Sequence, residues 1–348
     1  MSHGSINSKE LVGRALRGQQ APRPAAGPLA VHYCARVAGV SLRDYTLSPV
    51  VLSECVLRYY KRFTPDAVWL SADTWVNAEA MGAHVAIADE NQPLGGVGPP
   101  AVQGWADLER IPPPDPHRQG RWPLMLEAVR RVNDAIGGEV FIAACFDQFP
   151  FSLACALMGL EHVLRAVLEE PALVEALMRK CSDYTLAYAL ALAEAGADML
   201  SGGDSPAGLL GPTLYRRIAL PFERRIIDRL HERVPMPVSL HICGDTRALL
   251  ADLATTGADV LELDHQVDVA EVSQPLGPNV AIWGNLDPVA VLAQGTPNTV
   301  RQATVNLIRK LRGCGHARFV VSSGCTLAME TPAENLAAMF ETVRSFAK

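Results

Sequence analysis

The strongest constraint on the fold is an alternation, repeated eight times, of a short apolar run with a longer amphipathic stretch. Each apolar run has four to six residues, as a buried strand does, and the longer stretches have the periodicity of helices. The expected strands are Leu29–Tyr33, Ala67–Ser71, Val140–Cys145, Ala197–Ser201, Val238–Ile242, Asp259–Leu263, Val280–Trp283 and Arg318–Val321. The expected helical stretches include Pro49–Phe63, Pro123–Ile136, Leu160–Glu194, Leu214–Arg233, Thr246–Thr255, Thr299–Leu311 and Pro332–Phe346. Eight strands that alternate with helices predict an α/β fold with a parallel sheet, a (β/α)8 TIM barrel.

The length agrees with a single barrel. The chain has 348 residues, and (β/α)8 barrels commonly run from about 200 to over 400 residues in one domain. Residues 91–120 are rich in Gly and Pro and carry little periodicity, so we interpret them as an excursion between barrel units. We therefore expect residues 1–348 to form one domain with an N-terminal helical extension.

Charge and hydropathy exclude several classes of function. The 31 Lys and Arg residues against 37 Asp and Glu give a net charge of −6, so there is no overall basic field to attract nucleic acid or an anionic membrane. There is no run of about 18 apolar residues and no secretion signal at the start, so we expect a cytoplasmic protein with neither nucleic acid nor membrane as a partner. The alanine-rich stretch 187–197 allows close packing inside the barrel or between two copies of the chain, which leaves a homodimer open.

Three candidate metal ligands follow expected strands, at the end of the barrel where functional residues lie. His241 and Cys243 flank one residue at the end of the fifth strand, so their side chains point to one face, and Cys325 follows the eighth strand. One imidazole and two thiolates favour Zn2+, and three protein ligands with an open position are typical of a catalytic site. The fourth position could be taken by Glu262 or Asp264 of the sixth strand, by water or by substrate. The competing interpretation is that all three are ordinary buried side chains.

Acidic and amide side chains follow other strands. Asp73, Asp147 and Asp204 come directly after the second, third and fourth strands, where each could position a substrate, act as an acid or base, or only cap a helix. Asn285 follows the seventh strand. We select Asp73, Asp204 and Asn285 as candidate catalytic residues. Cys314 precedes the eighth strand, so we expect it at the opposite end of the barrel.

Segments spread over nearly the whole chain carry a family resemblance. They are 72–82 (ADTWVNAEAMG), 147–153 (DQFPFSL), 196–198 (GAD), 204–205 (DS) and 283–288 (WGNLDP). Together these segments resemble the uroporphyrinogen decarboxylase superfamily. Within it, His241-Ile-Cys243 with 322–328 (SSGCTLA) and 331–335 (TPAEN) resembles the zinc branch, the methylcobalamin:coenzyme M methyltransferases and their bacterial relatives.

The resemblance implies a barrel in which zinc binds a thiol. Similarity to cobalamin-independent methionine synthase makes Asp264 the better match for an acidic fourth ligand, and Asp73 matches the key aspartate of the decarboxylases. The chain departs from the decarboxylases at residues 31–36, where they carry an arginine-rich motif that grips substrate carboxylates. Decarboxylation of a tetrapyrrole is therefore the weaker interpretation.

The implied function is zinc-dependent transfer of a methyl group between a corrinoid (cobalamin) protein and a small thiol. Because no corrinoid-binding domain is recognisable in this chain, we expect a separate corrinoid protein to dock over the C-terminal face of the barrel. The alternatives are a corrinoid-linked demethylase acting on a methoxylated or methylamine-like donor, a uroporphyrinogen decarboxylase-like decarboxylase, and a barrel without catalysis. The methyl donor, the acceptor and the direction of transfer stay open.

Overall fold

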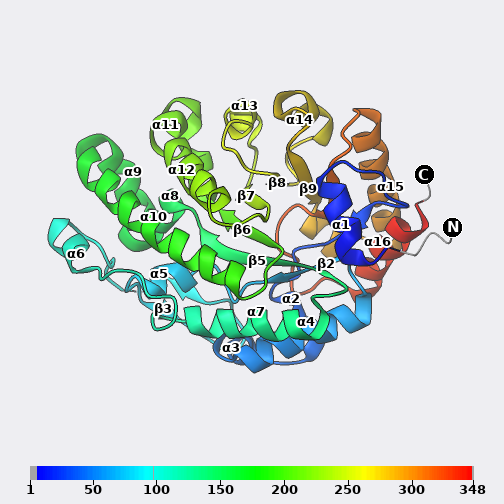
Figure 1. Ribbon diagram of the computed structural model, residues 1–348, viewed down its shortest axis with the longest axis horizontal. Coiled ribbons are helices and arrows are strands. Elements are labelled where there is room, and N and C mark those ends of the chain that lie inside the picture. Colours follow the sequence, from blue (N-terminus) through cyan, green and yellow to red (C-terminus); the bar gives the residue numbers. More distant parts are fainter. Residues whose placement is uncertain (1–5, 97, 347–348) are drawn as a thin grey trace.

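The computed structural model describes residues 6–96 and 98–346 and contains a nearly closed barrel of eight strands. All seven strand pairs of this sheet are parallel, and helices surround its outer side (Figure 1). The strands, in their order around the barrel, are β1 (Ala25–Ala26), β10 (Phe319–Ser323), β9 (Ala281–Leu286), β8 (Val260–Leu263), β7 (Val238–Ile242), β6 (Met199–Gly203), β5 (Phe141–Gln148) and β2 (Ala67–Leu70). The predicted (β/α)8 fold is confirmed.

The first strand is the one place where the predicted strand is wrong. It is Ala25–Ala26, whereas the predicted segment Leu29–Tyr33 forms a turn that leads into a helix. Leu29 and Val31 are buried as their apolar character requires, but they pack on the barrel interior as a covering segment. The segment follows Pro28, which has no N–H to donate to a ladder, so the strand ends early.

The gap between β1 and β2 is closed by an aspartate instead of a regular ladder. Asp66 donates its backbone N–H to the carbonyl of Ala26 at 2.9 Å, and its carboxylate accepts the N–H of Ala26 at 2.9 Å. Arg23 binds the same carboxylate through both terminal nitrogens, at 2.7 and 2.8 Å. A two-residue strand thus stays attached to the barrel.

The helices follow the predicted stretches, and three of these stretches are interrupted. In 246–255, a 3-10 turn (Arg247–Leu249) precedes a four-residue α-helix. The α-helices are α1 (Ser8–Leu16), α2 (Tyr33–Ala38), α3 (Leu42–Leu47), α4 (Pro49–Phe63), α5 (Val76–Ala80), α6 (Trp105–Arg110), α7 (Trp122–Ile136), α8 (Pro150–Met158), α9 (Leu160–Glu169), α10 (Pro171–Glu194), α11 (Gly211–Ile218), α12 (Leu220–His231), α13 (Leu250–Leu253), α14 (Val269–Leu276), α15 (Pro297–Gly313) and α16 (Ala333–Ser345). The stretches 160–194 and 214–233 are each divided in two, because Pro171 and Pro221 fit only the first turn of a helix.

Two apolar cores hold the barrel together. The interior core contains the inward side chains of the strands, such as Trp69 and Trp283, and is covered from one end by Leu11 and Val12 of α1. The second core fills the layer between the outer face of the strands and the helices. With the interior filled at the α1 end, the opposite end is left for a site.

The Gly- and Pro-rich excursion has local structure of its own. A short antiparallel pair, β3 (Val85–Ala86) with β4 (Leu94–Gly95), is followed by α6, and the segment then returns to the barrel at α7.

No single described helix is long and apolar enough to cross a membrane; α8 and α9 pass that test only as a pair bent by 107°.

Candidate metal centre

Three donor atoms converge at the carboxyl end of the barrel. His241 and Cys243 lie at the end of β7, and Cys325 lies just beyond β10. The His241 Nε2 is 3.0 Å from the Cys243 Sγ and 3.9 Å from the Cys325 Sγ, and the two sulfurs are 3.9 Å apart. Around a tetrahedral zinc ion the corresponding separations are about 3.6 Å for nitrogen to sulfur and about 3.8 Å for sulfur to sulfur. The chemistry of the donors fits a zinc ion with one coordination position left open. The two separations that involve Cys325 lie close to these values, while His241 and Cys243 would move apart by about 0.6 Å to hold the ion.

The backbone orients this group before any metal binds. The Nδ1 of His241 lies 2.9 Å from the carbonyl oxygen of Glu262 on the neighbouring strand β8. A carbonyl only accepts, so Nδ1 carries a proton, and Nε2 is the ring atom that faces the cysteines and can bind a metal once it is deprotonated. Gly244, at φ 86°, turns the chain directly after Cys243.

Mutual hydrogen bonds divide the protons unequally among the three groups. The hydrogen bond from Cys325 lowers the pKa of Cys243 to about 7, and the same bond helps raise the pKa of Cys325 to about 12. Burial works against a charged His241, but the hydrogen bond to Cys325 and the charge of Glu262 outweigh it and raise the pKa of His241 to about 9. The metal-free group therefore holds an imidazolium beside a thiolate.

We predict that binding of one zinc ion at pH 8 releases about two protons. At this pH His241 and Cys325 are still protonated while Cys243 is not, and a zinc site needs all three groups deprotonated. The apparent affinity for zinc should thus rise about a hundredfold per pH unit near pH 8 and fall as the pH falls. Calorimetric titration in two buffers of different ionisation enthalpy measures the number of protons released per zinc ion. Release of no protons would contradict the prediction.

Asp264 does not join the three donors. Its carboxylate accepts the backbone N–H groups of Gly244 and Gln266, both at 2.9 Å, and contacts His265 at 3.0 Å. It thereby holds the turn after Cys243, which makes it a positioning residue in this structure. Glu262, two residues earlier in the chain, lines the cavity beside the donors and accepts hydrogen bonds from the hydroxyls of two serines of β6 and β7.

A cavity of about 280 Å³ opens beside the metal donors. Its lining combines apolar side chains with acidic and small polar ones. The residues that line it are Leu29, Val31, His32, Trp69, Ser71, Asp73, Thr74, Gln92, Cys145, Asp147, Gln148, Ser152, Ser201, Gly202, Gly203, Ser205, Pro206, His241, Cys243, Glu262, Cys325 and Thr326. Most of these come from the ends of the strands, as the barrel fold predicts for an active site.

Asp73 lines the cavity and is held by an arginine that the sequence pattern does not reveal. Both of its carboxylate oxygens bind the guanidinium of Arg121, and one also accepts the N–H of Trp75 at 2.7 Å. Arg121 binds Glu79 as well, and its side chain is only 7% exposed. Arg121 stands where the excursion returns to the barrel, directly before α7, and no periodicity marks it.

Asp147 is placed in the cavity by an irregularity of β5. The pairing of β5 with β6 shifts between Cys145 and Gln148, and Asp147 adopts φ 65°, a left-handed conformation uncommon outside glycine. One of its oxygens accepts the N–H of Asn77 at 3.0 Å, and the other, Oδ1, has no hydrogen-bond partner. Burial and the nearby charge of Asp73 raise the pKa of Asp147 well above its usual range.

The other two selected residues lie outside the cavity lining. Asp204 is fully buried behind it, where one oxygen accepts the N–H and the hydroxyl of Ser152, both at 2.7 Å. Its other oxygen faces Glu223, a second buried carboxyl group that accepts the hydroxyl of Tyr215. The amide of Asn285 donates to the carbonyls of Asp264 and Val267 and supports the chain after β8.

The buried carboxyl pair gives a pH-dependent prediction. Burial raises the pKa of Asp204 from 3.8 to about 6, so the folded protein holds a proton there that the unfolded chain has already lost. Stability from this group is complete below about pH 4 and is lost as the pH rises to about 6. Asp204→Asn should therefore stabilise the protein at pH 7 by up to about 3 kcal/mol and change it little at pH 4. Urea unfolding at both pH values tests this, and an equal effect at both would refute the assignment.

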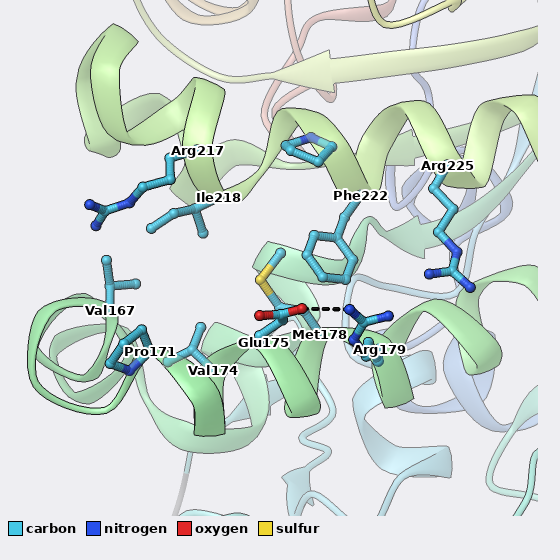
Figure 2. Close-up of a pocket in the computed structure, with 11 residues that line it drawn as sticks. Val167, Pro171, Val174, Glu175, Met178, Arg179, Arg217, Ile218, Phe222 and Arg225 are labelled. Carbon is cyan, nitrogen blue, oxygen red and sulfur yellow. Dashed lines mark hydrogen bonds and ion pairs between the residues drawn. The ribbon is translucent and has the colours of Figure 1, made fainter.

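A larger cavity, of about 450 Å³, lies on the outer surface between α9 and α10 on one side and α11 and α12 on the other (Figure 2). Figure 2 shows its apolar walls, which include Val174 and Phe222, and the ion pair between Glu175 and Arg179 at its edge. None of its described lining residues is a cysteine or a histidine, so it does not compete with the metal centre as a catalytic site.

The fold and the site define a parallel α/β barrel with a candidate metal centre at its mouth. One family model, described as "Uroporphyrinogen decarboxylase (URO-D)", matches residues 7–346, and the chain belongs to this family of enzymes. A uroporphyrinogen decarboxylase of Synechococcus sp. is 30% identical over 96% of this chain and 97% of its own length. A methylcobamide:CoM methyltransferase, MtbA of Methanosarcina acetivorans, is 32% identical over 81% of this chain and 80% of its own length.

Solved structures agree on the fold. A methyltransferase from Methanosarcina mazei superposes with a TM-score of 0.87 at 22% identity, covering 98% of this chain and 99% of its own. A B12-independent methionine synthase from Shewanella sp. gives a TM-score of 0.58 at 13% identity, covering 93% and 97%. The relatives thus include both decarboxylases and methyltransferases, and the choice between them depends on the site.

Proposed function

We propose that the protein is a zinc-dependent methyltransferase that moves a methyl group between a corrinoid carried by a second protein and a small thiol. The observation that carries the proposal is the triangle of His241, Cys243 and Cys325 beside the cavity. One imidazole and two thiolates with an open fourth position are the donor set of a catalytic zinc site. The relatives named as methylcobamide:CoM methyltransferases support the same activity.

In this proposal the three donors hold zinc, which when bound would lower the pKa of a substrate thiol and keep it as the nucleophilic thiolate. The carbonyl of Glu262 fixes the ring of His241, and Asp264 fixes the turn that carries Cys243. The thiolate sulfur forms a bond to the methyl carbon, the cobalt–carbon bond breaks with its electron pair left on the corrinoid, and the thiol proton passes to solvent. The cavity excludes water from the sulfur and sets which thiols enter.

A corrinoid is too large to enter a cavity of about 280 Å³, which is smaller than the pockets of about 300 to 1,000 Å³ that hold drug-sized ligands. The corrinoid must therefore approach the mouth from outside. This supports docking of a separate corrinoid protein over the carboxyl ends of the strands.

Uroporphyrinogen decarboxylation fits the cavity less well. Its substrate is a tetrapyrrole with many carboxylates, which need cationic partners. None of the described residues that line the cavity is an arginine or a lysine, and the volume is small for four pyrrole rings. These features weigh against decarboxylation even though decarboxylases are among the relatives.

The proposal is tested with the zinc-loaded protein, free methylcobalamin and a panel of small thiols. We expect the visible spectrum of methylcobalamin to be replaced by that of demethylated cobalamin, and a methyl thioether to appear by mass spectrometry. Methyl-cobalt that forms from cob(I)alamin and a methoxylated or methylamine-like donor would instead identify the demethylase. Release of CO2 from uroporphyrinogen, with no methyl transfer to any thiol, would overturn the proposal in favour of a decarboxylase.

A further inference from the structure

We infer that the thiol accepted by this cavity has a neutral or cationic tail, and that the cavity rejects thiols with an anionic tail. The inference rests on the proposed function and names the substrate class of the same site. Its first support is the charge of the lining. Asp73, Asp147 and Glu262 line the cavity, while none of its described lining residues is an arginine or a lysine.

The arginine that contacts Asp73 is not free to bind an anion. Arg121 binds both oxygens of Asp73 and one oxygen of Glu79, and it is not among the residues that line the cavity. To reach an anionic tail it would have to leave two carboxylates unpaired, one of them buried, which is costly. The ion pair therefore supplies no positive charge to a ligand.

The histidine next to Asp73 is uncharged. The Nε2 of His32 lies 2.8 Å from the carbonyl of Ala72, so its proton is used in a hydrogen bond with the backbone. Burial lowers the pKa of His32, and the ring therefore stays neutral at physiological pH. The other histidine in the lining, His241, belongs to the metal donors.

One buried acceptor in the cavity lining has no hydrogen-bond donor. Gln148 Oε1 is a buried acceptor atom without a partner, and Gln148 lines the cavity. A buried acceptor without a partner is costly, and an ammonium or hydroxyl group on a ligand would satisfy it. A sulfonate or carboxylate has only acceptor oxygens and would add a negative charge beside Asp73 and Glu262.

Three hydroxyls of the lining are already committed to other groups. Ser71 donates to the carbonyl of Asp73, and Ser201 donates to the carboxylate of Glu262. Ser152 uses its N–H and its hydroxyl on Asp204. An anionic tail would therefore find no arginine or lysine in the described lining, and none of these three hydroxyls free to bind it.

The test uses three thiols of the same two-carbon length that differ in the charge of the tail. They are 2-aminoethanethiol, 2-mercaptoethanol and 2-mercaptoethanesulfonate. With zinc-loaded protein and methylcobalamin, at rates corrected for the thiolate fraction of each thiol, we expect kcat/KM for the sulfonate to be at least about tenfold below that for the alcohol. Calorimetric titration of the same thiols without a methyl donor should give the same order of affinity.

A variant at the edge of the cavity tests whether the charge of the lining causes the selectivity among thiols. Thr74 lines the cavity and is exposed, so Thr74→Lys adds a cation without disturbing the core, and Thr74→Gln is the neutral control of similar length. We expect the lysine variant to raise the sulfonate-to-alcohol ratio at least about fivefold over the glutamine variant. Equal ratios in the two variants would overturn the assignment of selectivity to the lining charge.

The outcomes separate this inference from the proposed function. If the unmodified protein uses or binds the sulfonate thiol as well as the alcohol, the inference is overturned while the methyltransferase stands. If no thiol is methylated, the proposed function fails, and the calorimetric order still decides the charge preference. Absence of binding by all three thiols would overturn the inference as well.

Discussion

Replacing Cys325 by serine is expected to leave the protein with less than about a tenth of its zinc and to lower methyl transfer at least about a thousandfold. Serine is a poor ligand for zinc, and changes even in the residues that support a ligand cost about 10- to 100-fold in affinity or activity. With Cys325 gone, only His241 and Cys243 of the described donor group remain. Elemental analysis before and after addition of zinc, with the methylcobalamin assay, measures both effects.

Cys314 provides the matched control. It is also a partly buried free cysteine, but it lies at the end of α15, where its sulfur donates to the carbonyl of Leu311 at 3.2 Å. Cys314→Ser should keep about one zinc ion per chain and full activity. The metal centre would be refuted if Cys325→Ser retained all its zinc, or if methyl transfer persisted unchanged in a Cys243→Ala, Cys325→Ala double variant.

The barrel could be predicted from sequence because its signals are local. Each strand except the first is a short apolar run bounded by turn residues, and seven of the eight predicted runs overlap a strand. The first strand has only two residues, too few for any pattern, and it is held by Asp66, which lies 40 residues away from Ala26. A strand that depends on such a distant side chain leaves no local signal.

The grouping of the metal donors could be predicted because it follows from the barrel topology. Alternation along a strand sets His241 and Cys243 on one face, and closure of the barrel brings the end of β10 near the end of β7. The fold thus converts a gap of more than 80 residues into a contact between Cys243 and Cys325 at 3.9 Å. The order of the strands in the barrel was enough to predict that Cys325 lies near His241 and Cys243.

The roles of the acidic residues could not be predicted, because they depend on partners that no spacing specifies. Alternation along the strand predicts Asp264 on the same face as Glu262, yet its oxygens are taken by backbone N–H groups of the two neighbouring turns. Asp204 follows a strand as a catalytic residue would, but it lies behind the cavity against Glu223. Asp147 enters the cavity through a bulge in β5 that the apolar pattern does not show.

Arg121→Met is expected to lower the free energy of unfolding by about 3 to 5 kcal/mol at neutral pH. The substitution keeps a long side chain but leaves Asp73 as a buried carboxylate without its cation, and removal of one member of a buried pair typically costs this much. Asp73 is 3% exposed, so water cannot replace the guanidinium. Urea unfolding measured by circular dichroism gives the difference, provided that the slope of the transition is the same in both proteins.

The double variant Asp73→Asn, Arg121→Met separates the cost of an unpaired charge from the loss of packing. Asparagine keeps an oxygen to accept the N–H of Trp75 and carries no charge, so we expect the double variant to recover at least about half of the lost stability. Glu79 is 26% exposed and can turn to water, and it therefore needs no replacement. If the double variant is as unstable as Arg121→Met alone, the arginine acts through its packing, and Asp73 is held in the cavity by something other than this ion pair.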